Sequence, residues 1–144
     1  MSQIRVLALD VEGALISNSV SVFPRPMLKF FLERCHGLFE RIVVFTAVSE
    51  SRFRGIAEML ASEGGVPPWF ADIEYVHWNG PIKDLSFIPG CEVGEALLLD
   101  DLEQYVHPGQ LDRWVRIEQF EPPYSQIDTE LLRVLAELEV RLLS

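Results

Sequence analysis

The chain has 144 residues and a mass of 16.4 kDa, which is the length of one domain, and 49% of its residues are hydrophobic, which excludes a disordered chain. A net charge of −10 argues against non-specific nucleic-acid binding, which needs a basic face. The longest apolar runs, such as residues 42–47, fall far short of the roughly 20 residues of a membrane helix, and the N-terminus lacks a signal-peptide pattern. We therefore expect a single cytoplasmic domain, residues 1–144, with no membrane partner.

The first third of the chain predicts a strand, a loop and a helix. Residues 4–9 are an apolar run that ends at Asp10, which is typical of a buried strand. A loop or short hairpin is expected over residues 13–22, where glycine and serines break the pattern. Pro26 suits the first turn of a helix, which we expect to end at Gly37.

The middle of the chain continues this alternation. Residues 41–46 are apolar and β-branched and predict a second buried strand. Ser49 is placed to cap a second helix that ends at Gly64 and Gly65. The stretch that follows is the least decided, with a short strand expected over residues 73–78.

The last third predicts two more strands and a closing helix. Residues 96–99 form a clear buried strand, and residues 114–120 are a strand candidate. A final helix is expected over residues 127–143, with Ser125 and Asp128 as its capping box. Alternating strands and helices predict an α/β fold with a mainly parallel sheet.

Polar side chains follow three of the predicted strands. Asp10 and Glu12 come after the first, Thr46 ends the second, and Asp100 and Asp101 follow the strand at residues 96–99. Each acid alone is a common turn or cap former. However, the carboxyl ends of parallel strands share one edge of the sheet, where ligands bind. We therefore expect these side chains to converge.

Four segments carry a resemblance to a known family: residues 7–13 (LALDVEG), 25–47 (RPMLKFFLERCHGLFERIVVFTA), 82–88 (IKDLSFI) and 97–101 (LLLDD). In this order and spacing the sequence resembles the haloacid dehalogenase (HAD) superfamily. Within it, the sequence is similar to the NLI-interacting-factor-like phosphatases, which include the small phosphatases of the RNA polymerase II C-terminal domain. The resemblance implies a HAD-like, Rossmann-like three-layer fold without a large cap domain.

The resemblance also implies roles for the residues in these segments. Asp10 matches the nucleophile that attacks phosphorus and becomes an aspartyl phosphate. Glu12 matches the acid that protonates the leaving oxygen and later activates water. Thr46 matches the hydroxyl that holds a phosphoryl oxygen, and Lys83 matches the ammonium that neutralises the phosphate. Substrate binding is thereby assigned to Thr46, Ala47 and Lys83.

A cluster of carboxylates around one lysine would repel a phosphate dianion unless a hard cation were present. Ligation by oxygen atoms alone suits Mg²⁺. By the resemblance, the metal ligands are Asp10, the backbone carbonyl of Glu12 and one of the pair Asp100 and Asp101. The sequence leaves open which of the two binds directly.

The sequence departs from the family pattern at two positions. Glu12 stands where the second acid is usually aspartate, and Ala14 stands where a small hydroxyl residue is usual. Both changes leave room for an alternative, a catalytically weak or inactive HAD-like module that binds phosphate without turning it over.

The histidine, cysteine and aromatic residues give weaker indications of function than these motifs. His36, His77 and His107 are dispersed and are expected to bind no metal, and Cys35 and Cys91 are expected to be reduced thiols. The aromatic residues of segment 66–78 predict core or lid packing, with a substrate-recognition wall as the alternative.

These inferences predict a Mg²⁺-dependent phosphomonoester hydrolase that works through an aspartyl phosphate. The short intervals between the motifs hold no large cap, so the site is expected to be open and to suit a phosphorylated macromolecule, either a phosphoprotein or a nucleic-acid end. A small-metabolite or nucleotide phosphatase, closed by the aromatic segment, is the remaining alternative.

Overall fold

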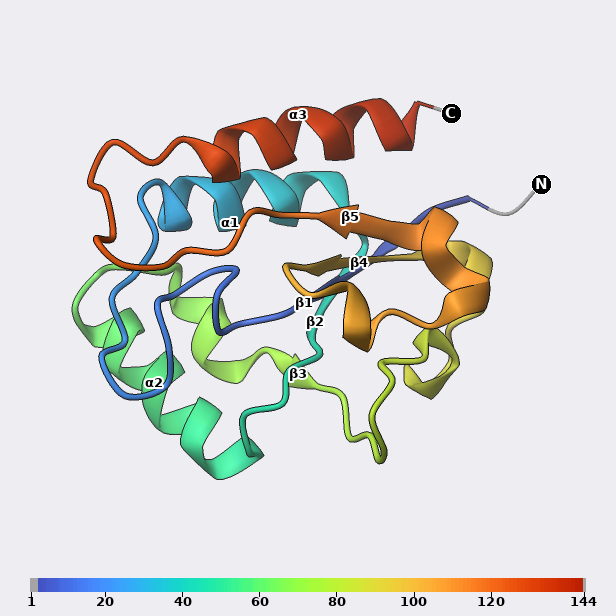
Figure 1. The fold of residues 1–144 in the computed structure, drawn as a ribbon, viewed down its shortest axis with the longest axis horizontal. Coiled ribbons are helices and arrows are strands. Elements are labelled where there is room, and N and C mark those ends of the chain that lie inside the picture. Colours follow the sequence, from blue (N-terminus) through green and yellow to red (C-terminus); the bar gives the residue numbers. More distant parts are fainter. Residues whose placement is uncertain (1–2, 144) are drawn as a thin grey trace.

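The structure is a computed structural model that describes residues 3–143 (Figure 1). It contains one five-stranded sheet in the order β3-β2-β1-β4-β5, and every neighbouring pair of strands is parallel. The strands are β1 (Val6–Leu9), β2 (Arg41–Val44), β3 (Glu74–Tyr75), β4 (Ala96–Asp100) and β5 (Trp114–Arg116). The predicted α/β class with a mainly parallel sheet is confirmed.

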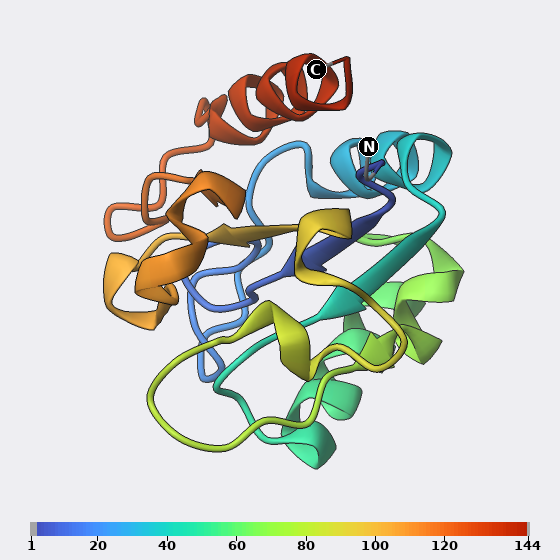
Figure 2. The same ribbon diagram turned by 90° about the vertical axis from the view of Figure 1, so that its right-hand side faces the viewer.

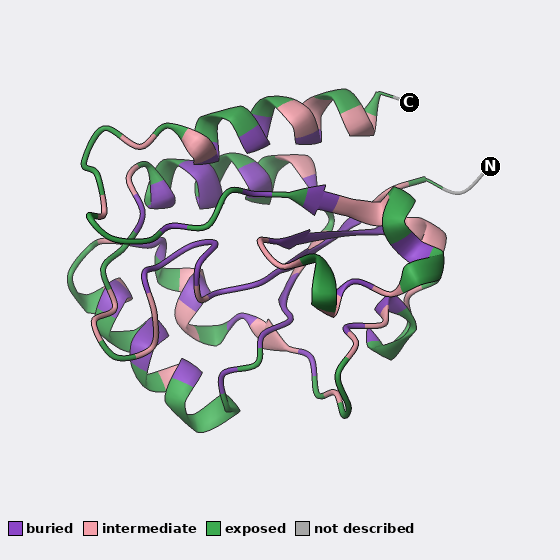
Figure 3. Ribbon diagram, viewed as in Figure 1, coloured by how far each residue is buried: buried purple, intermediate pink, exposed green. Residues whose placement is uncertain are grey.

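The central strands are buried on both faces, as strands in a parallel sheet with both faces covered must be. Every residue of β1 and β4 is buried (Figure 3). The register pairs Leu9 with Val44 on one side and with Leu99 on the other. The backbone N–H of Asp10 continues the ladder to the carbonyl of Leu99 at 2.9 Å. The residues that follow these strands therefore leave the sheet at one shared edge.

Three α-helices bury their apolar stripes against one face of the sheet: α1 (Leu28–Leu38), α2 (Glu50–Ser62) and α3 (Glu130–Leu142). On this face Leu7, Leu9 and Leu97 pack in the same cluster as Phe31, Phe53 and Leu135 from the helices. Figure 2 shows α1 and α3 side by side. Among residues 3–143, no helix has the length and apolarity needed to cross a membrane.

The opposite face of the sheet is covered by loops and short 3-10 turns instead of α-helices. Its core holds Val6, Ala8, Phe45, Leu98 and other apolar residues. Prolines and glycines at 80–81, 89–90 and 108–109 recur through the covering segments, and proline in a helix interior removes a hydrogen bond and clashes with the preceding turn. These residues disfavour a long helix, and this face is accordingly covered by short turns such as Leu85–Phe87.

Several predicted boundaries differ from the structure, and the strand expected over residues 73–78 is limited to Glu74–Tyr75. Helix α1 passes through Gly37 and ends at Leu38, because a glycine is tolerated where neighbouring side chains hold the helix by packing. The strand expected over residues 114–120 is limited to the three residues of β5, because only these pair with β4.

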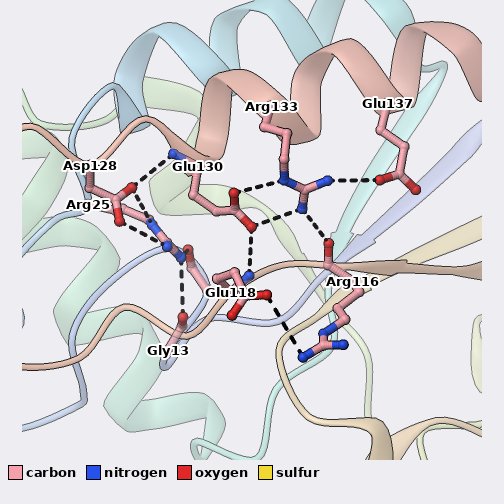
Figure 4. A network of polar contacts seen from close by, with 9 residues as sticks. Gly13, Arg25, Arg116, Glu118, Asp128, Glu130, Arg133 and Glu137 are labelled. Carbon is pink, nitrogen blue, oxygen red and sulfur yellow. Dashed lines mark hydrogen bonds and ion pairs between the residues drawn. The ribbon is translucent and has the colours of Figure 1, made fainter.

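The expected capping box of the last helix is wrong. Ser125 accepts a hydrogen bond from Ile127 N at 3.2 Å, and the helix starts two residues after Asp128. The Asp128 carboxylate accepts a hydrogen bond from Glu130 N at 3.0 Å, at the start of the helix, and two from Arg25, from Nε at 3.0 Å and from Nη2 at 3.1 Å (Figure 4). Only 1% of the Arg25 side chain is exposed, so its buried guanidinium needs the negative charge of this carboxylate.

Asp128→Asn is expected to lower the free energy of unfolding at pH 7 by about 2 kcal/mol. Burial raises the pKa of Asp128, but the hydrogen bonds from Arg25 and from Glu130 N together outweigh that effect and hold the pKa below its usual value. The ion pair therefore stabilises the fold fully at pH values above the pKa that Asp128 has in the unfolded chain. This stabilisation is lost as the pH falls through the lower pKa that Asp128 has in the folded protein. Urea denaturation at several pH values measures this.

An exposed ion pair of similar length serves as the control. Arg34 and Glu139 lie 3.1 Å apart with nearly half of each side chain exposed, so Glu139→Gln should change the stability by less than about 1 kcal/mol. Equal effects of the two substitutions would contradict a structural role for the Arg25–Asp128 pair.

Candidate active site

The shared edge of the sheet brings together a buried lysine and carboxylates from two strands. Lys83 Nζ donates to Asp10 Oδ1 at 2.9 Å and to Asp100 Oδ2 at 2.5 Å. Lys83 itself has no exposed surface. Its backbone N–H donates to the carbonyl of Tyr105 at 2.7 Å, which holds the loop against the sheet. Residues that are distant in the sequence thus converge, as the strand-end pattern predicts.

Burial and neighbouring charges shift the pKa values of Asp10, Lys83 and Asp100 in opposite directions. Burial raises the pKa of Asp10 to about 7 although Lys83 opposes it, and burial raises the pKa of Asp100 to about 6. Burial lowers the pKa of Lys83, but the two carboxylates outweigh this and raise it above its usual value. Lys83 therefore remains charged, and any further positive charge near Asp10 would favour its ionised, nucleophilic form.

Asp101 completes a group of acids that could hold a cation. Asp10, Asp100 and Asp101 each offer a carboxylate oxygen, and these atoms lie within 4.8 Å of one another. Asp100 already uses Oδ2 for Lys83 and Oδ1 for the backbone N–H of Leu102 at 2.9 Å. Asp101 Oδ1 is buried and has no hydrogen-bond partner, which is costly in an apolar interior unless a ligand satisfies it. An all-oxygen donor set with one orphaned oxygen fits a hard divalent cation.

Gly13 makes room for this acid, a role that the sequence did not reveal. Its φ of +78° lies in the left-handed region that favours glycine, and an added Cβ would overlap Asp101 Oδ2. Its carbonyl accepts a hydrogen bond from Phe120 N at 2.8 Å. The only sequence signal is the position of the glycine, one residue after the second acid.

Arg25 holds the same turn through its carbonyl groups, a role that the sequence did not reveal either. Its Nη1 donates to the carbonyl of Ala14 at 3.1 Å and to that of Gly13 at 3.4 Å (Figure 4). Its guanidinium also lies 5.2 Å from the centre of the Phe120 ring. Arg25 thus ties the turn after β1 to the C-terminal segment through Asp128. The arginine stands directly before Pro26, in a segment that carries the family resemblance.

The side chain of Glu12 is half-buried and is held by the following loop. Its Oε2 accepts a hydrogen bond from the backbone N–H of Ser19 at 2.5 Å, and the carbonyl of Ser19 accepts one from Arg52 of α2. The loop therefore fixes the direction of this carboxylate. Asp10, Asp100 and Asp101 supply the carboxylates of the candidate metal group.

Thr46 and Ala47 lie at the end of β2, beside a cavity of about 330 Å³. Thr46 is buried, and its Oγ1 accepts a hydrogen bond from Val48 N at 3.1 Å. Its carbonyl accepts a hydrogen bond from the indole N–H of Trp78 at 2.8 Å. Trp78 and His77 also line the cavity, so part of the aromatic segment lies beside the strand end that carries Thr46.

A parallel sheet without a large cap among residues 3–143, with a buried lysine between two strand-end carboxylates, is the arrangement that the sequence resemblance implies. A model of the NLI interacting factor-like phosphatase family matches residues 4–143, and the chain belongs to that family. The resemblance predicted from the four sequence segments is thereby confirmed.

Comparison with solved structures supports the fold. The structure is similar to that of Fcp1, an essential RNA polymerase II CTD phosphatase, with a TM-score of 0.59 and 12% sequence identity. The match covers 96% of this chain and 50% of the Fcp1 chain, so this chain spans half of that structure. A search of curated proteins found no match.

Proposed function

We propose that this protein hydrolyses phosphomonoesters through a covalent aspartyl phosphate on Asp10. The observation that carries the proposal is the position of the Asp10 carboxylate, which Lys83 Nζ holds at 2.9 Å in a buried site. A carboxylate oxygen of Asp10 forms a bond to phosphorus, and the bond from phosphorus to the ester oxygen breaks. Glu12 gives its proton to the departing oxygen. Glu12 then takes a proton from water as that water attacks phosphorus and releases Asp10.

Two further groups would bind the phosphoryl oxygens in this scheme. Lys83 supplies a buried positive charge, which is worth most where water is excluded. Thr46 supplies a hydroxyl just after β2, beside the exposed residue Ala47. Lys83 and Thr46 are therefore the two groups that we assign to phosphate binding, with Ala47 beside Thr46 as part of the substrate site.

We assign Mg²⁺ as the cofactor, held by the carboxylates of Asp10 and Asp101 and by the backbone carbonyl of Glu12. The orphaned Oδ1 of Asp101 supports its choice over Asp100, whose two oxygens are already hydrogen-bonded. When bound, the cation neutralises charge on the phosphoryl oxygens and lowers the pKa of Asp10.

Removal of divalent metal is expected to lower phosphate release at least about a hundredfold, because a metal ion contributes several kcal/mol of charge stabilisation. The measurement is hydrolysis of p-nitrophenyl phosphate with Mg²⁺, with EDTA, and with EDTA followed by excess Mg²⁺. Recovery in the third sample controls for loss of folded protein. Full activity in EDTA would contradict the cofactor assignment.

Glu12→Gln is expected to slow hydrolysis of alkyl phosphates by about 10²-fold or more, since protonation of a poor leaving group needs an acid. The first step with p-nitrophenyl phosphate should change little, because p-nitrophenolate leaves without a proton. Glu12→Asp, which shortens the acid by one methylene, should retain activity. Steady-state and burst kinetics with both ester classes measure these effects.

Glu118→Gln is the matched control for Glu12→Gln, because the Glu118 side chain is 71% exposed and lies in an exposed ion pair. It should leave both rates unchanged. Equal rates for wild type and Glu12→Gln across both ester classes would remove Glu12 from the mechanism.

The substrate that we propose is a phosphorylated macromolecule, such as a phosphoprotein. The absence of a large cap among the described residues supports it, and so does the activity named for the Fcp1 structure, a phosphatase of a polymerase domain.

A binding module with weak or no catalysis is the second candidate, favoured by Ala14 and by the hydrogen bond that occupies Glu12. The cavity beside Thr46 favours the third, a phosphatase of small esters.

We also propose that the chain, residues 1–144, acts as one catalytic domain in the cytoplasm. The family match over residues 4–143 and the single sheet support one domain. Cys35 and Cys91 are free, as expected from the sequence, and burial raises the pKa of Cys35 to about 12. Unpaired thiols are usual in a reducing compartment.

A further inference from the structure

The cavity beside Thr46 has one wall of aromatic carbon. Trp78 donates its indole N–H to the carbonyl of Thr46 at 2.8 Å, and the hydroxyl of Tyr75 donates to the carbonyl of Val48 at 2.5 Å. Because both polar atoms are satisfied by the backbone that follows β2, the two side chains offer ring carbon to the cavity. The wall is also rigid, since the Trp78 ring packs edge-on against the buried Phe45 at 5.6 Å.

A carboxylate, that of Glu50, also lines the cavity. Glu50 Oε1 lies 2.9 Å from Nε2 of His77, and both residues line the cavity. Arg54 is 3.8 Å from Glu50 and donates to the carbonyl of Ala71, so it faces the helix and the 3-10 turn Pro68–Asp72. With a net charge of −10 on the chain, this rim disfavours a second anionic group.

The position of the cavity connects it to the chemistry. Thr46, the proposed hydroxyl for the phosphoryl group, and its neighbour Ala47 line the cavity and follow β2 at the carboxyl edge of the sheet. A volume of about 330 Å³ is within the range of small-molecule sites, and such sites are lined by aromatic side chains with a few polar groups. The part of the substrate esterified to phosphate would therefore lie against Trp78.

We propose that this cavity binds a neutral planar ring in the leaving group of the substrate. The inference rests on the proposed phosphatase function and narrows its substrate class to phosphate esters that carry a flat ring and no second anionic group near it. Two sources share this chemistry, a tyrosine side chain and a nucleoside base. Stacking and edge contacts with Trp78 and Tyr75 would hold the ring.

The test compares benzyl phosphate with ethyl phosphate, whose alcohols are of similar acidity and so leave with similar difficulty. Benzyl phosphate should show a kcat/KM about tenfold higher, because aromatic contacts and apolar burial add to its binding. 2-Phosphoglycolate, which adds a carboxylate, should fall below ethyl phosphate. Phosphotyrosine and adenosine 5′-monophosphate then distinguish the two sources of the ring.

Trp78→Leu separates recognition of the ring from support of Thr46. Loss of the contact should bring the benzyl-to-ethyl ratio of kcat/KM down to about 2, whereas displacement of Thr46 alone would lower both rates and leave the ratio at its wild-type value. Trp69→Leu is the matched control, because Trp69 lines a different cavity beside His36 and should leave the ratio unchanged. A wild-type ratio near one, or an unchanged ratio in Trp78→Leu, would overturn the proposal.

A binding measurement separates this inference from the proposed function. Calorimetry with benzylphosphonate and ethylphosphonate, which cannot be hydrolysed at the carbon–phosphorus bond, should give a tighter dissociation constant for the ring compound by about tenfold. This preference without any turnover would sustain the ring site and refute the phosphatase. Hydrolysis of both esters with equal affinity for both phosphonates would refute the ring site and sustain the phosphatase.

Discussion

Asp10→Asn should lower kcat/KM for every phosphomonoester at least about a thousandfold, because an amide cannot replace the carboxylate as a nucleophile. The two side chains are nearly isosteric, and Lys83 keeps its 2.5 Å contact with Asp100. The fold should therefore be retained, with a melting temperature close to that of the wild type. Steady-state kinetics and thermal denaturation of the same preparation measure both.

An aspartate on the surface provides the control for this substitution. The Asp112 side chain is 74% exposed and lies 3.7 Å from Arg113, so Asp112→Asn should leave both the activity and the melting temperature unchanged. Activity of Asp10→Asn within tenfold of the wild type would contradict the nucleophile assignment.

The second large effect is expected for Lys83→Met, in both activity and stability. Without the ammonium group, Asp10 and Asp100 are left buried and unpaired, which costs about 3–5 kcal/mol in the metal-free protein. The same change removes the positive charge that faces the phosphate, so kcat/KM should fall by on the order of a hundredfold. Urea denaturation in EDTA and kinetics with Mg²⁺ measure the two losses separately.

The stability loss of Lys83→Met should depend on pH in one direction. Burial raises the pKa values of Asp10 and Asp100, and Lys83 is the group that opposes this. In Lys83→Met both pKa values rise further above those of the unfolded chain, so the folded state is favoured by protonation. The loss of stability should be smallest at acidic pH and grow as the pH rises through neutrality.

A second substitution tests whether the buried charges are the cause. Asp100→Asn added to Lys83→Met removes one unpaired carboxylate and should recover part of the stability without recovering activity. A double variant that is less stable than Lys83→Met would show that volume or packing is responsible for the loss.

Local pattern was sufficient to predict the sheet and the edge that carries the site. The apolar runs at residues 4–9 and 96–99 are short, and each ends in an acid, which predicts a buried strand followed by a polar loop. Burial on both faces makes such strands uniformly apolar, so periodicity was not needed to find them. The convergence of Asp10 with Asp100 then followed from parallel topology, because parallel strands present their carboxyl ends at one edge.

Contacts between distant residues could not be predicted in the same way. Arg25 and Asp128 are 103 positions apart, and the local pattern indicated for Asp128 only a role at the start of the last helix. Asp101 and Gly13 meet only because β1 and β4 are neighbours, so the need for a glycine there has no local signal. The family resemblance, and not the local pattern, pointed to Lys83, whose complete burial arises from two strands and the Tyr105 loop.

The central claim is that Asp10 becomes phosphorylated during turnover. The most direct measurement is rapid acid quenching of Glu12→Gln during turnover of p-nitrophenyl phosphate with Mg²⁺, followed by digestion and mass spectrometry of the peptide that contains residue 10. The account predicts phosphate on Asp10, accumulated because the second step lacks its base, and none in Asp10→Asn/Glu12→Gln. Nitrophenol release by the wild type with no phosphate on Asp10 of Glu12→Gln at any quench time would contradict it.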